Sequence, residues 1–168
     1  RAQGYKGFYL AIGCQGGRKP GVPGEDAAGV YTAVEFLKEA GQKEGFDLGG
    51  DVVVVGGGNV AIDAARVSTR CGTGTVSMFC LESRDEMPAS REEILEATEE
   101  KVAIHNGWGP QEILTENGRI VGVVFKKCIR VFDDNHRFAP VYDEQETMTV
   151  DCSEVIFSVG QGIVCRDL

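Results

Sequence analysis

Apolar runs alternate with helical patterns in the middle of the chain. Val52–Val55 is too apolar for a half-exposed strand and too short for a helix, so it predicts a buried parallel strand. The apolar positions that follow the next glycines predict a helix from about Asn59 to Arg70, which Gly72 ends. Thr75–Leu81 is the second predicted strand. Strand, glycine turn, helix and strand therefore follow one another in this segment.

A further helix and strand continue this order. Ser90 with Glu93 three residues later forms a capping-box pattern, which predicts that a helix begins there. Lys101–His105 is the third predicted strand. The order β-α-β-α-β requires a parallel sheet with right-handed crossovers.

After Gly109 the period changes to that of antiparallel strands. Gln111–Thr115 and Ile120–Phe125 are joined by Asn117-Gly118, a typical hairpin turn. A polar hairpin, the strand Glu146–Val150 and a buried closing strand, Glu154–Gly160, follow. The chain therefore predicts an α/β fold: a Rossmann-like parallel sheet with helices on one side and an inserted antiparallel β-meander, in a three-layer ββα arrangement.

The first fifty residues carry weaker patterns. Residues 8–13 (Phe-Tyr-Leu-Ala-Ile-Gly) predict a short buried strand, and the Gly/Pro-rich residues 16–26 predict an irregular link. Residues 30–40 suit a short amphipathic helix, and residues 41–50 a polar connection to the valine strand.

The glycine turn carries the main candidate chemistry. Gly56, Gly58 and Ala61 occupy the small positions of a G-x-G-x-x-G/A signature between a strand and a helix, which is the context of dinucleotide binding. Gly56 permits the tight turn, Gly58 lets the backbone approach a pyrophosphate, and Ala61 lets the helix pack close to the strand. The anion is expected at the helix N-terminus, where Asn59 and Val60 offer backbone N–H groups.

Composition excludes several other classes. Among 168 residues, 17 Lys and Arg stand against 26 Asp and Glu, and a net charge of −9 argues against nucleic-acid and anionic-membrane surfaces. No apolar run approaches the roughly 20 residues of a membrane span, and no signal-peptide pattern opens the sequence. Six cysteines without C-x-x-C spacing, and only two histidines, predict no metal site and free thiols of a reducing cytoplasm. Because the chain begins without Met, we expect a piece of a longer protein.

Four stretches together resemble one family. They are Leu10–Gly13 with Val22–Asp26, Gly56–Arg66, Met87–Ala89 and Phe157–Gln161. In order and spacing they are similar to the NAD(P)-binding domain of FAD-dependent pyridine nucleotide oxidoreductases of the glutamate synthase small-subunit type, within the two-dinucleotide-binding-domain flavoprotein superfamily.

This resemblance implies a domain organisation and a function. Residues 29–157 would form the NAD(P)-binding domain, and residues 1–28 and 158–168 the edges of the FAD domain into which it is inserted. The domain would pass hydride from NAD(P)H to FAD in the parent enzyme, without a catalytic side chain of its own. FAD is not expected to be held by this chain. The implied partners are the missing FAD domain and an iron–sulfur or ferredoxin-type electron acceptor.

Nucleotide preference is set at the end of the second strand. Relatives of the glutamate synthase type carry two arginines there, whereas this chain has Leu81-Glu82, whose carboxylate favours NAD(H) over NADP(H). Ser83, Arg84 and Arg91 remain within reach of a 2′-phosphate and leave NADP(H) open. Gly160 is included because the end of the last strand also resembles the family. The predicted cofactor-binding residues are therefore Gly56, Gly57, Gly58, Asn59, Val60, Ala61, Glu82, Ser83, Arg84 and Gly160.

Other interpretations stay open at this point. Met87–Ala89 either shapes an adenosine pocket or simply starts a helix, and Trp108 either flanks adenine or covers the core edge. His105 is more typical of a polar loop residue than of a cofactor contact. Asp63 and Arg66 are more typical of a structural pair than of direct contacts to the cofactor. For the whole chain, the rival hypotheses are that the glycine loop is a flavin site, or that the domain is a non-catalytic nucleotide-sensing or interaction module.

Overall fold

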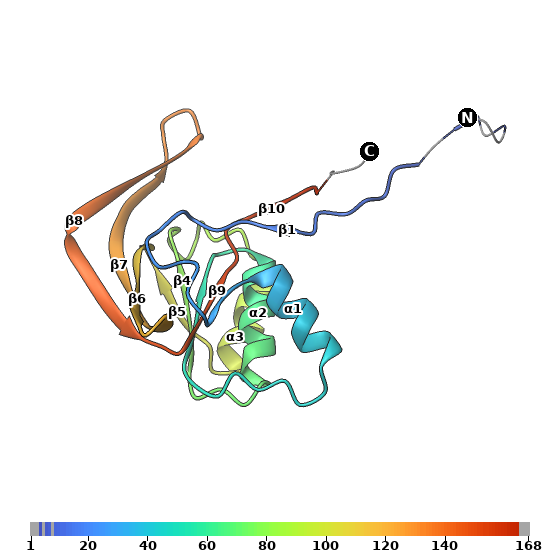
Figure 1. Cartoon of the computed structure of the whole chain (residues 1–168). Helices are drawn as coiled ribbons and strands as arrows, with labels where there is room; N and C mark the ends of the chain where they lie inside the picture. Colours follow the sequence, from blue (N-terminus) through green and yellow to red (C-terminus); the bar gives the residue numbers. More distant parts are fainter. Residues whose placement is uncertain (1–3, 5, 8, 165–168) are drawn as a thin grey trace.

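A five-stranded parallel sheet forms the centre of the computed structural model, which describes residues 4, 6–7 and 9–164 (Figure 1). Its strands lie in the order β2 (Val30–Thr32), β9 (Glu154–Phe157), β3 (Val52–Val55), β4 (Val76–Cys80) and β5 (Ala103–Asn106). One face is covered by α1 (Ala33–Gln42), α2 (Asn59–Thr69) and α3 (Arg91–Glu99). The antiparallel strands β6 (Trp108–Glu116), β7 (Arg119–Phe132) and β8 (Phe138–Asp151) lie on the other side.

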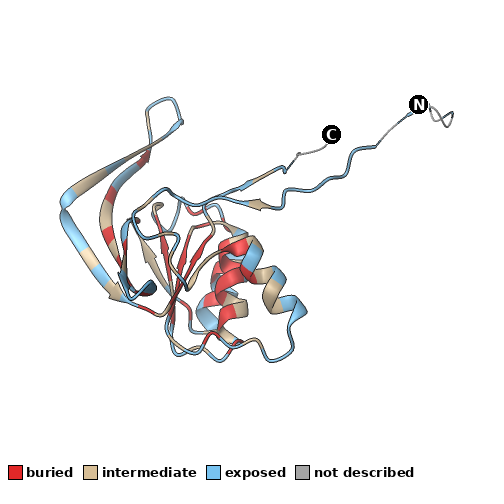
Figure 2. Cartoon of the chain, viewed as in Figure 1, coloured by how far each residue is buried: buried red, intermediate tan, exposed pale blue. Residues whose placement is uncertain are grey.

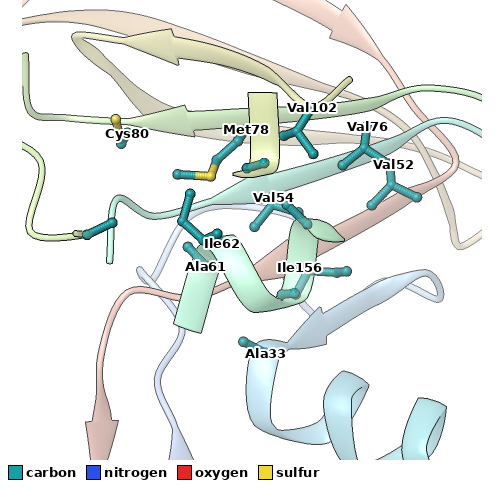
Figure 3. Close-up of a cluster of buried hydrophobic side chains, with 14 of the residues drawn as sticks. Ala33, Val52, Val54, Ala61, Ile62, Val76, Met78, Cys80, Val102 and Ile156 are labelled. Atoms are coloured by element: carbon teal, nitrogen blue, oxygen red, sulfur yellow. The ribbon is translucent and has the colours of Figure 1, made fainter. Parts of the chain in front are cut away.

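Both faces of the sheet are buried, which explains its continuous apolar strands. Val52 and Val54 point into the core shared with the helices, and Val53 and Val55 into the core shared with the meander. Figure 2 shows the buried positions concentrated in the sheet and on the surfaces packed against it, and Figure 3 shows Val52, Val54 and Ile62 in the helix-side core. Strand residues alternate between faces, so a strand covered on both sides favours apolar residues at consecutive positions.

This architecture confirms the predicted fold class. The sheet is parallel throughout, the helices lie on one face, and the meander is inserted between β5 and the last sheet strand, β9. The predicted turn at the start of the meander is also present. Asn117 and Gly118 both have positive φ, 51° and 79°, as a two-residue hairpin turn of type I′ requires.

The strands β7 and β8 form a longer arm than the sequence predicted. Each has 14 residues, and together they extend beyond the parallel sheet (Figure 1). The prediction placed strands only at 120–125 and 146–150, because the polar residues between them lack a strand pattern. In the structure those residues pair along the arm, from Gly122 opposite Asp151 to Phe132 opposite Phe138.

The first predicted strand was wrong. Residues 9–13 have no regular structure, and Tyr9 and Leu10 are 93% and 71% exposed; Phe8 lies outside the described residues. A strand needs a hydrogen-bonding neighbour, and in the described part of the chain the pairing begins only at β1 (Gly16–Gly17), which meets β10 (Gln161–Gly162). The irregular link predicted for 16–26 therefore starts with a short strand.

The start of α1 differs from the prediction, whereas α3 begins after Ser90 as predicted but with an incomplete capping box. Val30–Thr32, predicted as helical, is instead the strand β2, and α1 begins after Thr32, whose side chain and that of Glu35 form a capping box. At α3 the predicted capping box is only half present. Ser90 Oγ accepts the Glu93 N–H at 3.3 Å, but the Ser90 N–H donates to Asn59 Oδ1 rather than to Glu93.

Helix and strand ends elsewhere lie close to the predictions. The helix α2 ends at Thr69, and Gly72 takes the predicted left-handed conformation with φ 66°. The last sheet strand ends at Phe157, so Ser158–Gly160 lies beyond it rather than within it. Arg66 is a structural residue: it forms ion pairs with Glu93, Glu96 and Glu100 and so ties α2 to α3.

Candidate functional site

Three consecutive glycines join β3 to α2, and the space around each of them differs. Gly56 has φ 144°, and a Cβ there would collide with the carbonyl oxygen of Ser158. A Cβ on Gly57 would lie 2.8 Å from Glu82 Oε2 and 3.2 Å from Cys80 Cβ. Around Gly58, in contrast, a Cβ would meet no atom within 4 Å. Neither packing nor backbone conformation inside this chain requires glycine at position 58.

The open space at Gly58 lies at the N-terminus of α2. Gly58 is the N-cap and has no side chain to accept a hydrogen bond, and its carbonyl already accepts the N–H groups of Ala61 and Ile62. The backbone N–H groups of Asn59 and Val60, in the first turn, are thus available to an external acceptor. Their partial positive charge and the helix dipole favour an anion at this place.

Ala61 has a different role from its neighbours. It is fully buried in the core between α2 and the sheet. A larger side chain would force the helix away from the sheet, so Ala61 sets the distance between them. It supports the glycine loop without bordering the space above it.

A cleft of about 780 Å³ opens above the glycine loop, and its volume lies in the range of small-molecule sites. Seven of the predicted residues line it: Gly56, Gly57, Gly58, Asn59, Val60, Glu82 and Gly160. Ser83 and Arg84 do not; they border a second cleft of about 530 Å³. The structure therefore separates two residues that the sequence had grouped with Glu82.

Glu82 is held at the glycine loop by the end of β5. Its backbone oxygen accepts hydrogen bonds from Asn106 Nδ2 at 3.1 Å and from the Gly107 N–H at 3.2 Å. Asn106 Nδ2 also lies 3.2 Å from Cys80 Sγ. These contacts fix the backbone at the end of β4 and leave the Glu82 carboxylate beside Gly57, in the cleft.

The loop from Glu82 to α3 is also attached to the glycine loop. The Ala89 N–H donates to the Gly57 oxygen at 3.0 Å, and the Ser90 N–H donates to Asn59 Oδ1 at 2.9 Å. Pro88 lines the cleft. The segment 87–89 therefore leads into α3, and its Pro88 borders the cleft.

The meander forms a wall of the cleft that sequence reasoning missed. Lys126, Phe138, Pro140 and Tyr142 line it together with Trp108. Lys126 Nζ lies 4.4 Å from the centre of the Tyr142 ring and 3.0 Å from Glu144 Oε1. No local motif marks these residues, because only the folding of β7 and β8 over the sheet brings them to the glycine loop.

Residues before α1 complete the other end of the cleft. Arg18, Lys19, Pro20 and Val22 line it, and the Arg18 N–H donates to the Gly160 oxygen at 3.2 Å. Lys19 Nζ is already paired with Asp26 at 3.0 Å. The glycine and proline content of this segment predicts a loop, and the family resemblance covers it only from Val22 onward; neither signal places Arg18 or Lys19 at the cleft.

His105 and the cysteines have structural surroundings. The His105 ring stacks on Phe79 with centroids 4.5 Å apart, and His105 is not among the residues lining the cleft. All five cysteines in the described part of the chain are free; Cys165 lies outside it. Burial, with the nearby charge of Glu82, raises the pKa of the Cys80 thiol to about 12. Cys80 therefore stays protonated and unreactive at neutral pH, although it borders the cleft.

Metal and membrane features are not found in the described ranges. Residues 4, 6–7 and 9–164 contain no group of three or more His, Cys, Asp or Glu side chains placed to hold a metal ion. No helix among them is long and apolar enough to cross a membrane. The cleft therefore depends on backbone N–H groups, three lysine or arginine side chains and one carboxylate, that of Glu82.

Solved structures share this fold. FprA of Mycobacterium tuberculosis in complex with NADPH superposes with a TM-score of 0.73 at 19% identity, covering 90% of this chain and 49% of that one. Thioredoxin reductase of Lactococcus lactis gives a TM-score of 0.64 at 22% identity, covering 87% and 43%. At these identities the likeness establishes the fold.

The proteins related in sequence are oxidoreductase subunits that are longer than this chain. The NADP(+)-dependent formate dehydrogenase subunit beta of Moorella thermoacetica is 35% identical over 164 residues, 94% of this chain and 23% of that protein. The glutamate synthase (NADPH) small chain of Halomonas elongata is 30% identical over 166 residues, 91% of this chain and 35% of that one. No protein-family model matches the sequence. The chain thus spans about a quarter to a third of these curated relatives.

Proposed function

Because this chain belongs to the family of the glutamate synthase small chain and related NAD(P)H-dependent oxidoreductase subunits, we propose that it binds the nicotinamide dinucleotide for a flavoprotein oxidoreductase. The observation that carries the proposal is the open space at Gly58, beside the uncapped N-terminus of α2. A pyrophosphate there accepts hydrogen bonds from the Asn59 and Val60 N–H groups. The space that a Cβ would fill is the space that the phosphates need.

The residues of this chain bind and orient the dinucleotide. When bound, the dinucleotide supplies a hydride to the FAD of the parent enzyme. Val55, Phe79 and the meander residues Trp108 and Tyr142 line the cleft and exclude water from it. Hydride transfer between two cofactors requires no side chain as an acid or nucleophile.

Glu82 supports a preference for NAD(H) over NADP(H). Its carboxylate lies beside Gly57 at the end of β4, where a ribose 2′-hydroxyl donates a hydrogen bond and a 2′-phosphate is repelled. At 4 Å and an effective dielectric near 20 that repulsion is about 4 kcal/mol per pair of unit charges. Several relatives are named for NADP or NADPH, so the preference proposed for this chain rests on Glu82 alone.

The proposed partner is an FAD domain on the same polypeptide. The chain enters the sheet domain through β1 and leaves it through β10, and these two strands pair side by side (Figure 1). This arrangement supports the proposal that residues 29–157 are inserted into an FAD domain, whose edges are residues 1–28 and 158–168. Residues 1–3, 5, 8 and 165–168 of those edges lie outside the described part. Tyr9, Leu10 and Ile163 expose apolar surface there, as a contact with a missing domain requires. An iron–sulfur or ferredoxin-type acceptor belongs to that parent.

Calorimetric titration of the 168-residue chain with NADH, NADPH and FAD tests this proposal. We expect NADH to bind more tightly than NADPH and FAD to bind weakly or not at all. Tight FAD binding without binding of either nicotinamide nucleotide would assign the glycine loop to the flavin. If none of the three binds, the hypothesis of a non-catalytic interaction module gains support.

A charge reversal tests the role of Glu82. Glu82→Arg replaces the repelling carboxylate by a partner for the 2′-phosphate, so the ratio of NADH to NADPH affinity should fall by roughly tenfold or more. Glu92→Arg, an exposed substitution on α3, is the control with the same charge change. An unchanged ratio in Glu82→Arg contradicts the preference but leaves dinucleotide binding itself standing.

A further inference from the structure

A second cleft lies on the other side of the segment that carries Glu82. Its volume is about 530 Å³, and it shares only Leu81 with the first cleft. The loop after β4, the end of β5 and the strand β7 form its walls. Glu82 is absent from its lining, whereas its neighbours Ser83 and Arg84 border it.

Three cationic side chains border this cleft, against two carboxylates, those of Glu86 and Asp133. Arg84, Lys127 and Arg130 border it, and neither Arg84 nor Lys127 forms an ion pair with any carboxylate of the described residues. Arg130 has only a long contact, 3.8 Å, with the fully exposed Asp134. In a chain with a net charge of −9, a cleft with more cationic than acidic side chains departs from the overall charge balance.

The carboxylates at this cleft are already occupied by hydrogen bonds. Glu86 Oε2 accepts from Ser83 Oγ at 2.6 Å. Asp133 Oδ1 accepts the backbone N–H groups of Asn135 at 2.8 Å and Arg137 at 2.9 Å. These bonds hold the two carboxylates in the loop and the hairpin turn, and neither carboxylate forms an ion pair with the three cations.

Lys127 is held in place at the back of the cleft. Its Nζ lies 4.7 Å from the centre of the Trp108 ring, and 3.5 Å from the position of the Cβ that Gly107 lacks. Gly107 in turn is fixed by hydrogen bonds to Glu82 and Cys128. The ammonium group therefore sits on a rigid part of the sheet edge, not on a freely moving side chain.

We propose that this second cleft binds a phosphate monoester of a small organic molecule, separately from the dinucleotide. A phosphate monoester carries nearly two negative charges and three acceptor oxygens, which suit the guanidinium groups of Arg84 and Arg130 and the ammonium group of Lys127. The organic part contacts the exposed apolar side chains of Ile129 and Phe132, which also line the cleft. This site does not depend on which dinucleotide the first cleft prefers.

An NMR titration with phenyl phosphate, in the presence of saturating NADH, tests the site. We expect shifts at the backbone amides of Arg84, Gly107 and Lys127 and none at the glycine loop. In the double variant Arg84→Ala/Lys127→Ala the affinity for phenyl phosphate should fall by roughly tenfold or more, because two charged partners are lost. Lys38→Ala, an exposed lysine on α1, is the control and should leave the affinity unchanged.

The same variants separate this proposal from a role in dinucleotide binding. NADH and NADPH affinities of the double variant should equal those of the unmodified chain. If phenyl phosphate does not bind, or if its shifts fall on the glycine loop, the proposal is wrong. It is also wrong if the double variant loses NADPH affinity alone, since Arg84 and Lys127 would then serve the 2′-phosphate of the dinucleotide.

Discussion

A single asparagine holds the loop that carries Glu82, whose carboxylate is the basis of the proposed nucleotide preference. Asn106 Nδ2 donates to the Glu82 oxygen and contacts Cys80 Sγ, while Gly57 leaves room for the Glu82 carboxylate on the other side. The sequence placed Glu82 correctly at the end of the second strand, but nothing local marked Asn106, 24 residues later. Its role follows only from the pairing of β4 with β5, which sets Cys80 opposite Asn106.

Asn106→Ala should therefore reduce discrimination between the two nucleotides. A lost hydrogen bond to the loop costs about 1 kcal/mol, so NADH affinity should fall about fivefold while NADPH affinity changes less. Calorimetry with both nucleotides measures this ratio, and Asn135→Ala, in the exposed hairpin turn, is the control. An equal loss for both nucleotides would mean that Asn106 only maintains the fold.

The strand β9 shows how an element can be apolar in pattern and still contain a buried charge. Glu154 begins this strand and is 6% exposed; its Oε2 has no hydrogen-bond partner, and its Oε1 lies 3.8 Å from the Arg119 guanidinium. Burial raises the pKa of the Glu154 carboxyl, and Arg119 only partly opposes this shift. The charged Glu154 carboxylate is therefore desolvated without full compensation, which destabilises the folded state at neutral pH.

Glu154→Gln should stabilise the chain at neutral pH. Because the folded-state pKa is raised, the favourable contribution of this carboxyl is present below its ordinary pKa and is lost as pH rises through the folded-state value. We expect the variant to gain about 1 kcal/mol at about pH 7 and to lose this advantage in acid. Urea unfolding across the pH range measures both effects, and Glu146→Gln on the exposed face of β8 is the control.

For the molecule as a whole, the sheet couples the meander to the cleft. Phe79, on β4, lines the cleft and stacks on Phe125, on β7, with ring centres 4.1 Å apart. Phe125 is fully buried between the two sheets. The layer opposite the helices therefore supports the floor of the cleft above the glycine loop as well as forming its wall.

Phe125→Ala should destabilise the molecule and loosen the cleft together. Removing a buried phenyl group costs about 3–5 kcal/mol of unfolding free energy, and Phe79 loses its stacking partner. Urea denaturation and NADH titration of the same variant measure the two effects. Leu95→Ala, at an exposed position of α3, should change stability by less than about 0.5 kcal/mol. Unchanged NADH affinity in Phe125→Ala would contradict the coupling.

The sequence by itself determined the order of layers and the glycine loop. Val52–Val55 is buried on both faces. A continuous apolar strand is typical of a sheet with both faces covered, so the parallel sheet could be predicted from the sequence. The turns at Gly72 and at Asn117-Gly118 were also predictable, because their backbone conformations strongly favour those residues. The strand predicted at 8–13 failed because apolar residues alone do not supply a pairing neighbour.

Only the tertiary structure decided which distant residues share the cleft. Lys126 and Tyr142 reach it through the fold of the meander, Arg18 through the pairing of β1 with β10, and Asn106 through the register of β4 and β5. In the tertiary structure Ser83 and Arg84 border a separate cleft, although they follow Glu82 directly in the sequence. Local motifs encode backbone conformation, whereas side-chain proximity between strands depends on register and on the packing of whole layers.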